Sequence, residues 1–239
     1  MGVGADIEPF ADACGLDIEA PDLIGHGTFQ CDDPAEYSLD AQLEYWSVRI
    51  PKGSVLIGYS MGGRLALQFA CRYLHHLSGL VLIGATPGLQ NRTERIDRQT
   101  WDHKTAERIR RLGVERFYNE WQKMPIISTQ QQIENDTKIE MRAHRMMQSV
   151  EGLANSMTHF GTGTMPDCWG ALSGLTLPTL LMVGEKDVKY REIAGQMLAR
   201  LPEETAECSI ILDSGHCAHL EQVLESADVL KKWLKSRFS

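Results

Sequence analysis

One stretch constrains the fold of this chain more than any other: a short apolar run at residues 55–57 that ends at Gly58. The apolar spacing from Leu65 to Tyr73 then predicts a helix. Ser60 lies between the two, inside the pattern G-x-S-x-G. A serine on such a sharp strand-to-helix turn is typical of a nucleophile elbow, whose strained backbone exposes the hydroxyl above a sheet. We expect Gly58 and Gly62 to let the strand and the helix approach closely.

Further strands and helices alternate along the chain. Short apolar runs at 80–84, 179–184 and 208–212 predict buried strands, and helical patterns occupy 193–201 and 223–238. Strands that alternate with helices predict an α/β fold with a mostly parallel sheet covered on both faces. Ligands of such sheets bind at the carboxyl ends of the strands.

The first fifty residues carry weaker signals. We expect a short helix near residues 8–13, an extended segment at 16–20 that continues into a strand over 21–27, and an amphipathic helix over 39–46. His26 falls in the glycine turn that ends this strand, and we interpret it as a turn residue.

Three strand ends supply complementary groups. Ser60 follows the first strand, Asp187 follows the run that ends at Gly184, and His216 follows the run that ends at Leu212. The order Ser, Asp, His is the one found in α/β-hydrolases. A serine needs an imidazole to take its proton, and the imidazole needs a carboxylate that fixes its tautomer. These three residues are therefore the predicted catalytic triad.

Alternatives exist for two of the three positions. Glu185 and Asp213 also follow the strands, but Asp187 lies where a loop can turn back. His216 is preferred to His219 because it is the first imidazole after its strand. The backbone N–H of Met61, next to the serine, is the predicted oxyanion donor.

The middle of the chain differs from the rest in pattern and charge. Strand signals are absent from 86–173, so we expect a core at 1–85 and 174–239 with a helical lid inserted at 86–173. The net charge is −8, yet Lys and Arg outnumber Asp and Glu by 12 to 9 between Gly88 and Val150. The acidic total argues against a nucleic-acid partner, whereas a basic insertion suits an anionic ligand.

Composition limits the remaining possibilities. No apolar run is long enough to cross a membrane, and the N-terminus lacks the features of a signal peptide. The six cysteines show no C-x-x-C spacing and are interpreted as reduced cytosolic thiols, without a zinc site. We expect a cytoplasmic monomer that uses neither a metal nor another cofactor.

Nearly the whole chain resembles one family within the α/β-hydrolases, the 2-succinyl-6-hydroxy-2,4-cyclohexadiene-1-carboxylate synthases of menaquinone biosynthesis. The matching stretches, in order, are PDLIGHG, GYSMGGRLAL, TPGLQNRTERIDR, GLANSM, GTGTMPDCW, GEKDVKY and SGHCAHLEQ. The TPGLQ and GTG-x-x-P blocks are the most specific to this family.

The resemblance implies an activity and a set of site residues. The family eliminates pyruvate from 2-succinyl-5-enolpyruvyl-6-hydroxy-3-cyclohexene-1-carboxylate, with the Ser–His pair acting as a base. It places the triad at Ser60, Asp187 and His216. Arginines suit the carboxylates of this small polycarboxylate substrate because their planar forks bind carboxylates through two hydrogen bonds. The substrate-binding residues implied are Tyr59, Arg64, Arg98, Trp121 and Arg145.

The start of the chain departs from the family pattern. Residues 3–10 resemble the segment that follows a His-Gly-Phe loop, so the N-terminal strands and this loop, with its second oxyanion donor, are absent from the sequence. We expect Met1 to be an internal methionine of a longer frame, and the present form to be poorly stable and weakly active. A version extended upstream by about 15–25 residues, roughly one strand and its loops, would test this.

Two other functions fit the same motifs. A general serine esterase or C–C bond hydrolase would use the same triad, but it has no need of clustered arginines. A truncated, inactive form would keep the insertion and lose turnover. Labelling of Ser60 by a serine-directed phosphonate separates an intact triad from a broken one.

Overall fold

A four-stranded parallel sheet forms the centre of the computed structural model, which describes residues 2–238. The strands lie in the order β1-β2-β3-β4, with β1 at Ser54–Tyr59, β2 at Leu77–Ile83, β3 at Thr179–Gly184 and β4 at Ala206–Ile211. Gly58 is level with Leu82 in the first pair of strands, and Leu181 is level with Cys208 in the last. The four strands that the apolar runs predict are confirmed.

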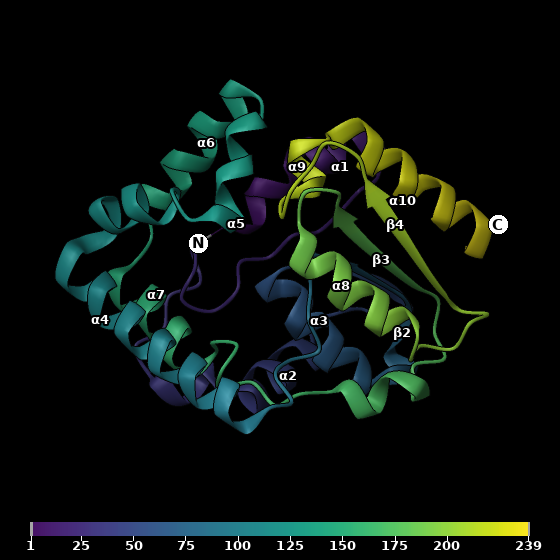
Figure 1. Ribbon diagram of the computed structural model, residues 1–239, viewed down its shortest axis with the longest axis horizontal. Coiled ribbons are helices and arrows are strands. Elements are labelled where there is room, and N and C mark those ends of the chain that lie inside the picture. The colour runs from purple at the N-terminus through teal and green to yellow at the C-terminus, as the bar shows by residue number, and fades with distance from the viewer. Residues whose placement is uncertain (1, 239) are drawn as a thin grey trace.

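Helices and short 3₁₀ turns connect and cover the strands (Figure 1). None of the helices described is long and apolar enough to cross a bilayer. Their bounds are η1 Gly4–Ile7, α1 Glu8–Cys14, η2 Pro34–Tyr37, α2 Leu39–Ser47, α3 Met61–Arg72, η3 Leu74–His76, α4 Arg92–Trp121, α5 Pro125–Ser128, η4 Thr129–Gln132, α6 Asn135–Met146, α7 Val150–His159, η5 Trp169–Gly174, α8 Val188–Leu198, α9 Ala218–Glu221 and α10 Val223–Phe238.

Both faces of the sheet are buried, as the apolar runs require. Helices α2, α3 and α8 pack on one face, and α1 and α10 pack together on the other. Alternate residues of β1 point to opposite faces of the sheet. Leu56 packs toward α3, whereas Val55 and Ile57 pack toward α1 and α10. This alternation follows from the two-residue period of a strand.

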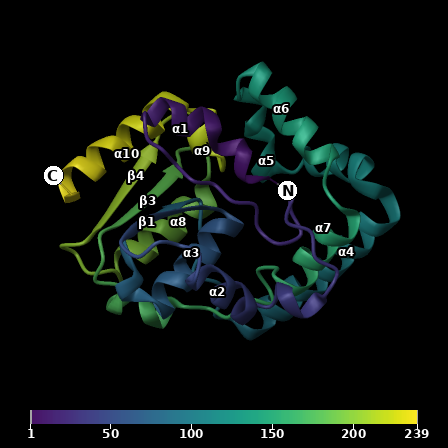
Figure 2. The ribbon, with the colours of Figure 1, turned by 180° about the vertical axis from the view of Figure 1, so that it is seen from behind.

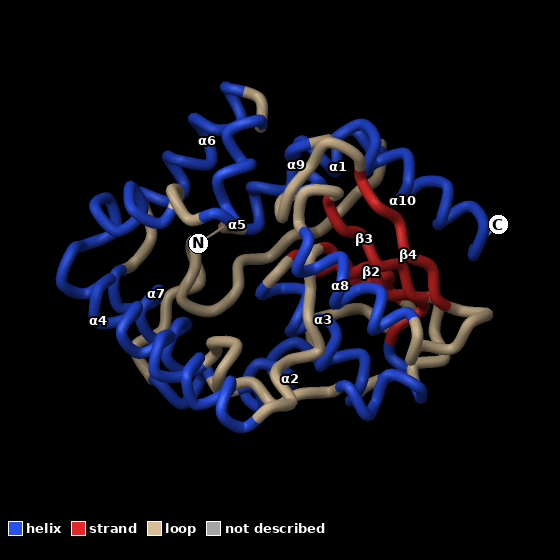
Figure 3. Tube along the Cα trace, viewed as in Figure 1, coloured by secondary structure: helices blue, strands red, loops and turns tan. Residues whose placement is uncertain are grey.

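Between β2 and β3 the described chain contains helices and connecting loops but no strand (Figure 3). The side chain of Asn91 caps the start of α4 by accepting hydrogen bonds from the N–H groups of Thr93 and Glu94. Gly113 kinks α4 with a φ of 71°, and Phe117 beyond it packs against Leu153 of α7 in a small separate core. We call residues 86–173 the helical insertion.

The predicted strand before β1 is wrong. The segment from Leu16 to Ala20 and its continuation to Gly27 form no strand, apart from an isolated bridge between His26 and Phe29. Within residues 2–238, β1 pairs only with β2, so its other edge has no strand beside it (Figure 2). A cavity lies between this edge and the 16–20 segment. An extended segment becomes a strand only when a neighbouring backbone is within hydrogen-bonding reach.

Candidate active site

Ser60 lies on the turn between β1 and α3, as the motif predicts. Its φ of 49° and ψ of −105° fall outside the regions that non-glycine residues favour. Its N–H donates to the carbonyl of Ile83 on β2 at 2.9 Å, which fixes the turn at the carboxyl edge of the sheet. Strained backbone of this kind persists where the surrounding structure enforces it, and it is often found at active sites.

The glycines that allow the close approach differ in part from those expected. A Cβ at Gly58 would lie 2.6 Å from Gly62 O and Gly63 Cα, and a Cβ at Gly63 would lie 2.7 Å from Ala85 Cβ. A Cβ at Gly62 meets nothing within 4 Å. Gly62 therefore points away from β1, because helical geometry turns successive side chains by about 100°. Gly58 and Gly63 are the positions that need glycine.

Ser60, His216 and Asp187 form a continuous hydrogen-bonded row. His216 Nε2 lies 2.9 Å from Ser60 Oγ, and His216 Nδ1 lies 2.6 Å from Asp187 Oδ2. His216 is 5% exposed and Asp187 is 9% exposed, so water does not compete for the bond between them. With Nδ1 donating to the carboxylate, Nε2 is left as an acceptor for the serine hydroxyl.

The structure separates the three candidate acids and the two candidate imidazoles. Asp213 is exposed, and the Glu185 carboxylate accepts the N–H of Asp213, so neither of them contacts His216. His219 is buried; its ring centroid lies 5.8 Å from that of Phe10 in an edge-on contact and 4.6 Å from that of Tyr59 in a tilted one. Only Asp187 and His216 are aligned with Ser60.

Two tyrosines flank the imidazole of His216. The ring centroid of Tyr190 lies 4.5 Å from that of His216, and the centroid of Tyr59 lies at 5.4 Å. Burial raises the pKa of both phenols above the usual value, so both are neutral at pH 7 and in mild alkali. The tyrosines thus give the imidazole apolar contact on its sides without adding charge.

The cavity beside the edge of β1 continues above the triad into the space between the sheet and the helical insertion, and its whole volume is about 1610 Å³. Apart from Asp187, which lies behind His216, every site residue that the sequence predicts lines this cavity. They are Tyr59, Ser60, Met61, Arg64, Arg98, Trp121, Arg145 and His216. Met61 is the first residue of α3, and its N–H donates to no acceptor among residues 2–238.

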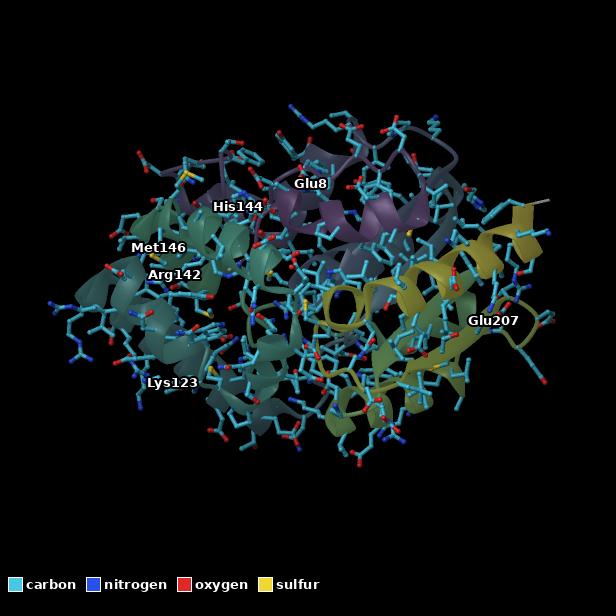
Figure 4. The ribbon with its side chains drawn as sticks, turned by 90° about the horizontal axis from the view of Figure 1, so that it is seen from above. Glu8, Lys123, Arg142, His144, Met146 and Glu207 are labelled. Atoms are coloured by element: carbon cyan, nitrogen blue, oxygen red, sulfur yellow. The ribbon has the colours of Figure 1, made fainter. Side chains whose placement is uncertain are left out.

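Two of the cavity arginines already have carboxylate partners. Arg98 Nε lies 2.8 Å from an oxygen of Asp102, and Arg145 lies 3.5 Å from Asp6 and donates to the carbonyl of Met141 at 2.6 Å. His144 also bonds Asp6 at 2.8 Å; Figure 4 shows His144 on α6 near the start of α1. These ion pairs fix both guanidinium groups in the lining of the cavity.

Arg64 differs from the other two. It is 9% exposed, and its Nε donates to the sulfur of Met165 at 3.3 Å, but no carboxylate of the described residues lies within 4 Å of it. Burial, together with the nearby charge of Arg98, lowers the pKa of Arg64 to about 10. At neutral pH Arg64 is thus a buried cation with no described carboxylate in contact with it, which is costly unless an anion binds beside it.

Sequence reasoning missed residues that hold the predicted ones in place. Asp102 is fully buried; its second oxygen accepts the N–H of Gly163 at 3.1 Å while the first binds Arg98. A Cβ at Gly163 would lie 2.5 Å from the backbone of Gln99, which explains the second glycine of the GTG block. The spacing of Arg98 and Asp102 is a signal, but i,i+4 pairs are common on exposed helices.

Two buried histidines should lower the free energy of unfolding in mild acid. Burial lowers the pKa of His219 to about 3 and that of His26 to about 4. In the unfolded chain both histidines have the ordinary pKa of about 6.5, so they bind protons as the pH falls from 7 to 5. In the folded chain they stay neutral over this range. Each histidine should therefore lower the free energy of unfolding by about 2 kcal/mol over this range.

Urea titrations at pH 7 and pH 5 test this expectation. His219→Asn should reduce the pH dependence by about half, whereas His75→Asn at an exposed position should leave it unchanged. If His219→Asn keeps the full wild-type dependence, His219 is not neutral in the folded state at pH 5.

A strained serine, a buried histidine and a buried carboxylate in this order above a parallel sheet define a protein of the serine-hydrolase class. Comparison with known proteins gives the family. Residues 4–229 match the Alpha/beta hydrolase family. A putative 2-succinyl-6-hydroxy-2,4-cyclohexadiene-1-carboxylate synthase of Bacillus subtilis is 36% identical over 90% of this chain and 80% of its own. A synthase of the same name from Salmonella paratyphi B is 34% identical over 75% of this chain and 68% of its own.

Solved structures agree with the sequence relatives. The structure of MenH from S. aureus superimposes with a TM-score of 0.93 and 27% identity, covering 100% of this chain and 91% of that one. A thermophilic esterase from Thermogutta terrifontis has a TM-score of 0.78 at 22% identity, covering 100% and 87%, and shares the fold. The chain therefore belongs to the α/β-hydrolase family and, within it, to the 2-succinyl-6-hydroxy-2,4-cyclohexadiene-1-carboxylate synthases.

Proposed function

We propose that the protein is a lyase of menaquinone biosynthesis that eliminates pyruvate from 2-succinyl-5-enolpyruvyl-6-hydroxy-3-cyclohexene-1-carboxylate. The observation that carries this proposal is Arg64, a buried cavity cation that lies four residues after Ser60 and has no carboxylate within 4 Å among residues 2–238. A substrate with several carboxylates supplies the missing anion. An ester of a neutral acid does not.

The reaction is a proton abstraction followed by loss of a leaving group. The ring carbon that carries the succinyl carbonyl loses its proton, and the electron pair forms a double bond toward the neighbouring alkene. That alkene shifts by one bond, the C–O bond to the enolpyruvyl group breaks, and enolpyruvate leaves and gains a proton to become pyruvate. Negative charge develops on the succinyl carbonyl oxygen during the first step, so this oxygen needs hydrogen-bond donors.

The triad supplies the base for this step. His216 Nε2 takes the proton of Ser60 as the serine oxygen takes the ring proton, and Asp187 stabilises the imidazolium that forms. The free N–H of Met61 faces the same cavity and is the proposed donor to the developing oxyanion. Trp121 and Tyr59 provide apolar walls beside the ring.

The helical insertion is the proposed lid over this site, with the core formed by 1–85 and 174–239. Its arginines Arg98 and Arg145 face the cavity from α4 and α6. All six cysteines are unpaired, which supports the proposed cytoplasmic location. A monomer remains our prediction for the assembly state.

Arg98→Ala and Arg145→Ala should each lower kcat/KM for the anionic substrate. The expected decrease corresponds to a loss of about 2–4 kcal/mol of transition-state stabilisation. The loss should be nearly absent for a neutral aryl ester, because such an ester has no carboxylate for the guanidinium to bind. Arg142→Ala is a matched control, since Arg142 lies on α6 and bonds Asn119 and Glu115 at its surface. Equal losses on both substrates would mean that the substitutions damage the insertion and that the carboxylate contacts are not the cause.

A general serine esterase is the second candidate function. The observation in its favour is the complete triad, with a 2.9 Å Ser60–His216 contact that also suits acylation. Brisk hydrolysis of simple aryl esters with no turnover of the enolpyruvyl substrate would reverse the ranking. A triad that fails to label with a serine-directed phosphonate would support an inactive form instead.

A further inference from the structure

One face of α3 contacts the segment through which the helical insertion returns to the core. Arg64 Nε donates to the sulfur of Met165 at 3.3 Å, and the side chain of Gln68 donates to the carbonyl of Pro166 at 2.7 Å. Positions 64, 68 and 71 share one face of the helix, so Cys71 is the next residue along this contact. The helix and the returning segment therefore run side by side in the same direction.

The lengths of the two segments place a second cysteine level with Cys71. From Arg64 to Cys71 the helix rises about 10 Å, and three residues of extended chain, such as Met165 to Cys168, cover about the same distance. Cys71 packs against the core cluster that contains Cys168, and the two thiols interact directly. Both are free thiols.

Cys168 is held firmly behind Cys71. The N–H of Cys168 donates to the carbonyl of Pro87 at 2.8 Å, and its sulfur lies 3.4 Å from the same oxygen. The indole N–H of Trp169 donates to the carbonyl of Gly88 at 3.0 Å. Cys168 is 7% exposed, whereas Cys71 is half-buried, so a small oxidant reaches Cys71 first. Redox-sensitive cysteines often have a second, resolving cysteine next to them in this way.

The two thiols also differ in acidity. The hydrogen-bonding contact with Cys168 lowers the pKa of the Cys71 thiol, and the same contact together with burial raises the pKa of Cys168. Because the thiolate is the reactive form, Cys71 is the nucleophile of the pair and Cys168 keeps its proton. Cys208 on β4 is also half-buried, but burial raises the pKa of its thiol, so it serves as a comparison.

We propose that Cys71 and Cys168 form a redox-sensitive modification site, which hydrogen peroxide converts into a disulfide between α3 and the returning end of the insertion. The sulfur of Cys71 attacks one peroxide oxygen; an S–O bond forms, the O–O bond breaks and water leaves. The sulfur of Cys168 then attacks this sulfenic acid, and the S–S bond forms as the S–O bond breaks and a second water leaves. The two thiols lose two electrons and two protons, and the peroxide is reduced to water.

The bridge makes the stability of the protein depend on oxidation. It closes a covalent loop from residue 71 to residue 168, and cross-links that close long loops restrict the unfolded chain most. The oxidised protein should therefore melt about 5 °C or more above the reduced protein, and dithiothreitol should reverse the shift. Neither cysteine is among the residues that line the cavity above the triad, so this inference does not rest on the proposed function.

Peptide mapping with differential alkylation, at increasing times after hydrogen peroxide is added, follows each cysteine separately. The cross-linked Cys71–Cys168 peptide should appear at least about tenfold faster than Cys208 is oxidised. Cys168→Ser should stop the reaction at a sulfenic acid on Cys71, which dimedone traps. Cys71→Ser should leave Cys168 unmodified. The matched control Cys208→Ser should form the bridge at the wild-type rate.

First oxidation at Cys208, a sulfenic acid that persists on Cys71 of the wild-type protein, or bridges only between separate molecules would each overturn the proposal. An oxidised protein that melts no higher than the reduced one would also contradict it, since the bond would then strain the native structure. The wild-type peptide map and the two melting temperatures decide the question even if a serine variant does not fold.

Discussion

Ser60→Ala should lower kcat for the elimination by about 10³-fold or more while leaving the melting temperature nearly unchanged. The hydroxyl is the atom placed to take the ring proton, and His216 Nε2 lies 2.9 Å from it. Alanine at this position leaves the imidazole without the group through which it acts. Steady-state kinetics with the enolpyruvyl substrate, together with thermal unfolding, measure both quantities.

His216→Ala should cause a loss of similar size, and the double variant should be no worse than either single one. Residues that act as one unit show such non-additivity. Ser78→Ala is a suitable control, because that hydroxyl only donates to the carbonyl of Gly53 at a distant strand end. Turnover by Ser60→Ala within a few-fold of wild type would remove Ser60 from the mechanism.

Arg64→Met should lower kcat/KM for the polycarboxylate substrate by about 10²–10³-fold and raise the melting temperature of the free protein. Both changes have the same cause. The guanidinium is buried with no carboxylate partner, so the folded protein carries the cost of an unpaired charge. In the complex, a substrate carboxylate pairs with the guanidinium and removes that cost. Removing one partner of such a buried charge pair typically costs about 2–5 kcal/mol of binding free energy.

Kinetics and differential scanning calorimetry on the same preparation test both expected changes, the decrease in kcat/KM and the increase in melting temperature. Arg72→Met lies on the same helix but pairs with Asp40 at the exposed surface, and it should change neither activity nor stability greatly. A drop in melting temperature for Arg64→Met would show that the guanidinium stabilises the fold. In that case Arg64 would have a structural role, and its assignment as the binding group for a substrate carboxylate would be wrong.

Local patterns in the sequence determine much of this protein. The apolar runs at 55–57, 80–84, 179–184 and 208–212 become β1 to β4, because a strand buried on both faces must be apolar throughout. The triad follows from chain order, since parallel strands bring Ser60, Asp187 and His216 to one edge of the sheet. Both predictions depend only on short stretches and on the topology they imply.

Contacts between distant segments decided the rest. Leu16–Ala20 forms no strand because its state depends on a neighbouring backbone and not on its own residues. Glu185 and Asp213 were excluded as the acid by loop geometry. Arg98 and Arg145 proved to have partners in Asp102 and Asp6, while Arg64 has none.

The physical reason is the same in each case. Whether a charge is paired, a backbone is bonded or a glycine is needed depends on which atoms lie within a few ångströms. Chain segments that are far apart in sequence bring those atoms together. Asp6 and Arg145 are separated by more than half of the chain, yet they meet at 3.5 Å. The sequence alone therefore predicts the triad and the sheet, and the tertiary structure shows that Arg64, unlike Arg98 and Arg145, has no carboxylate within 4 Å among residues 2–238.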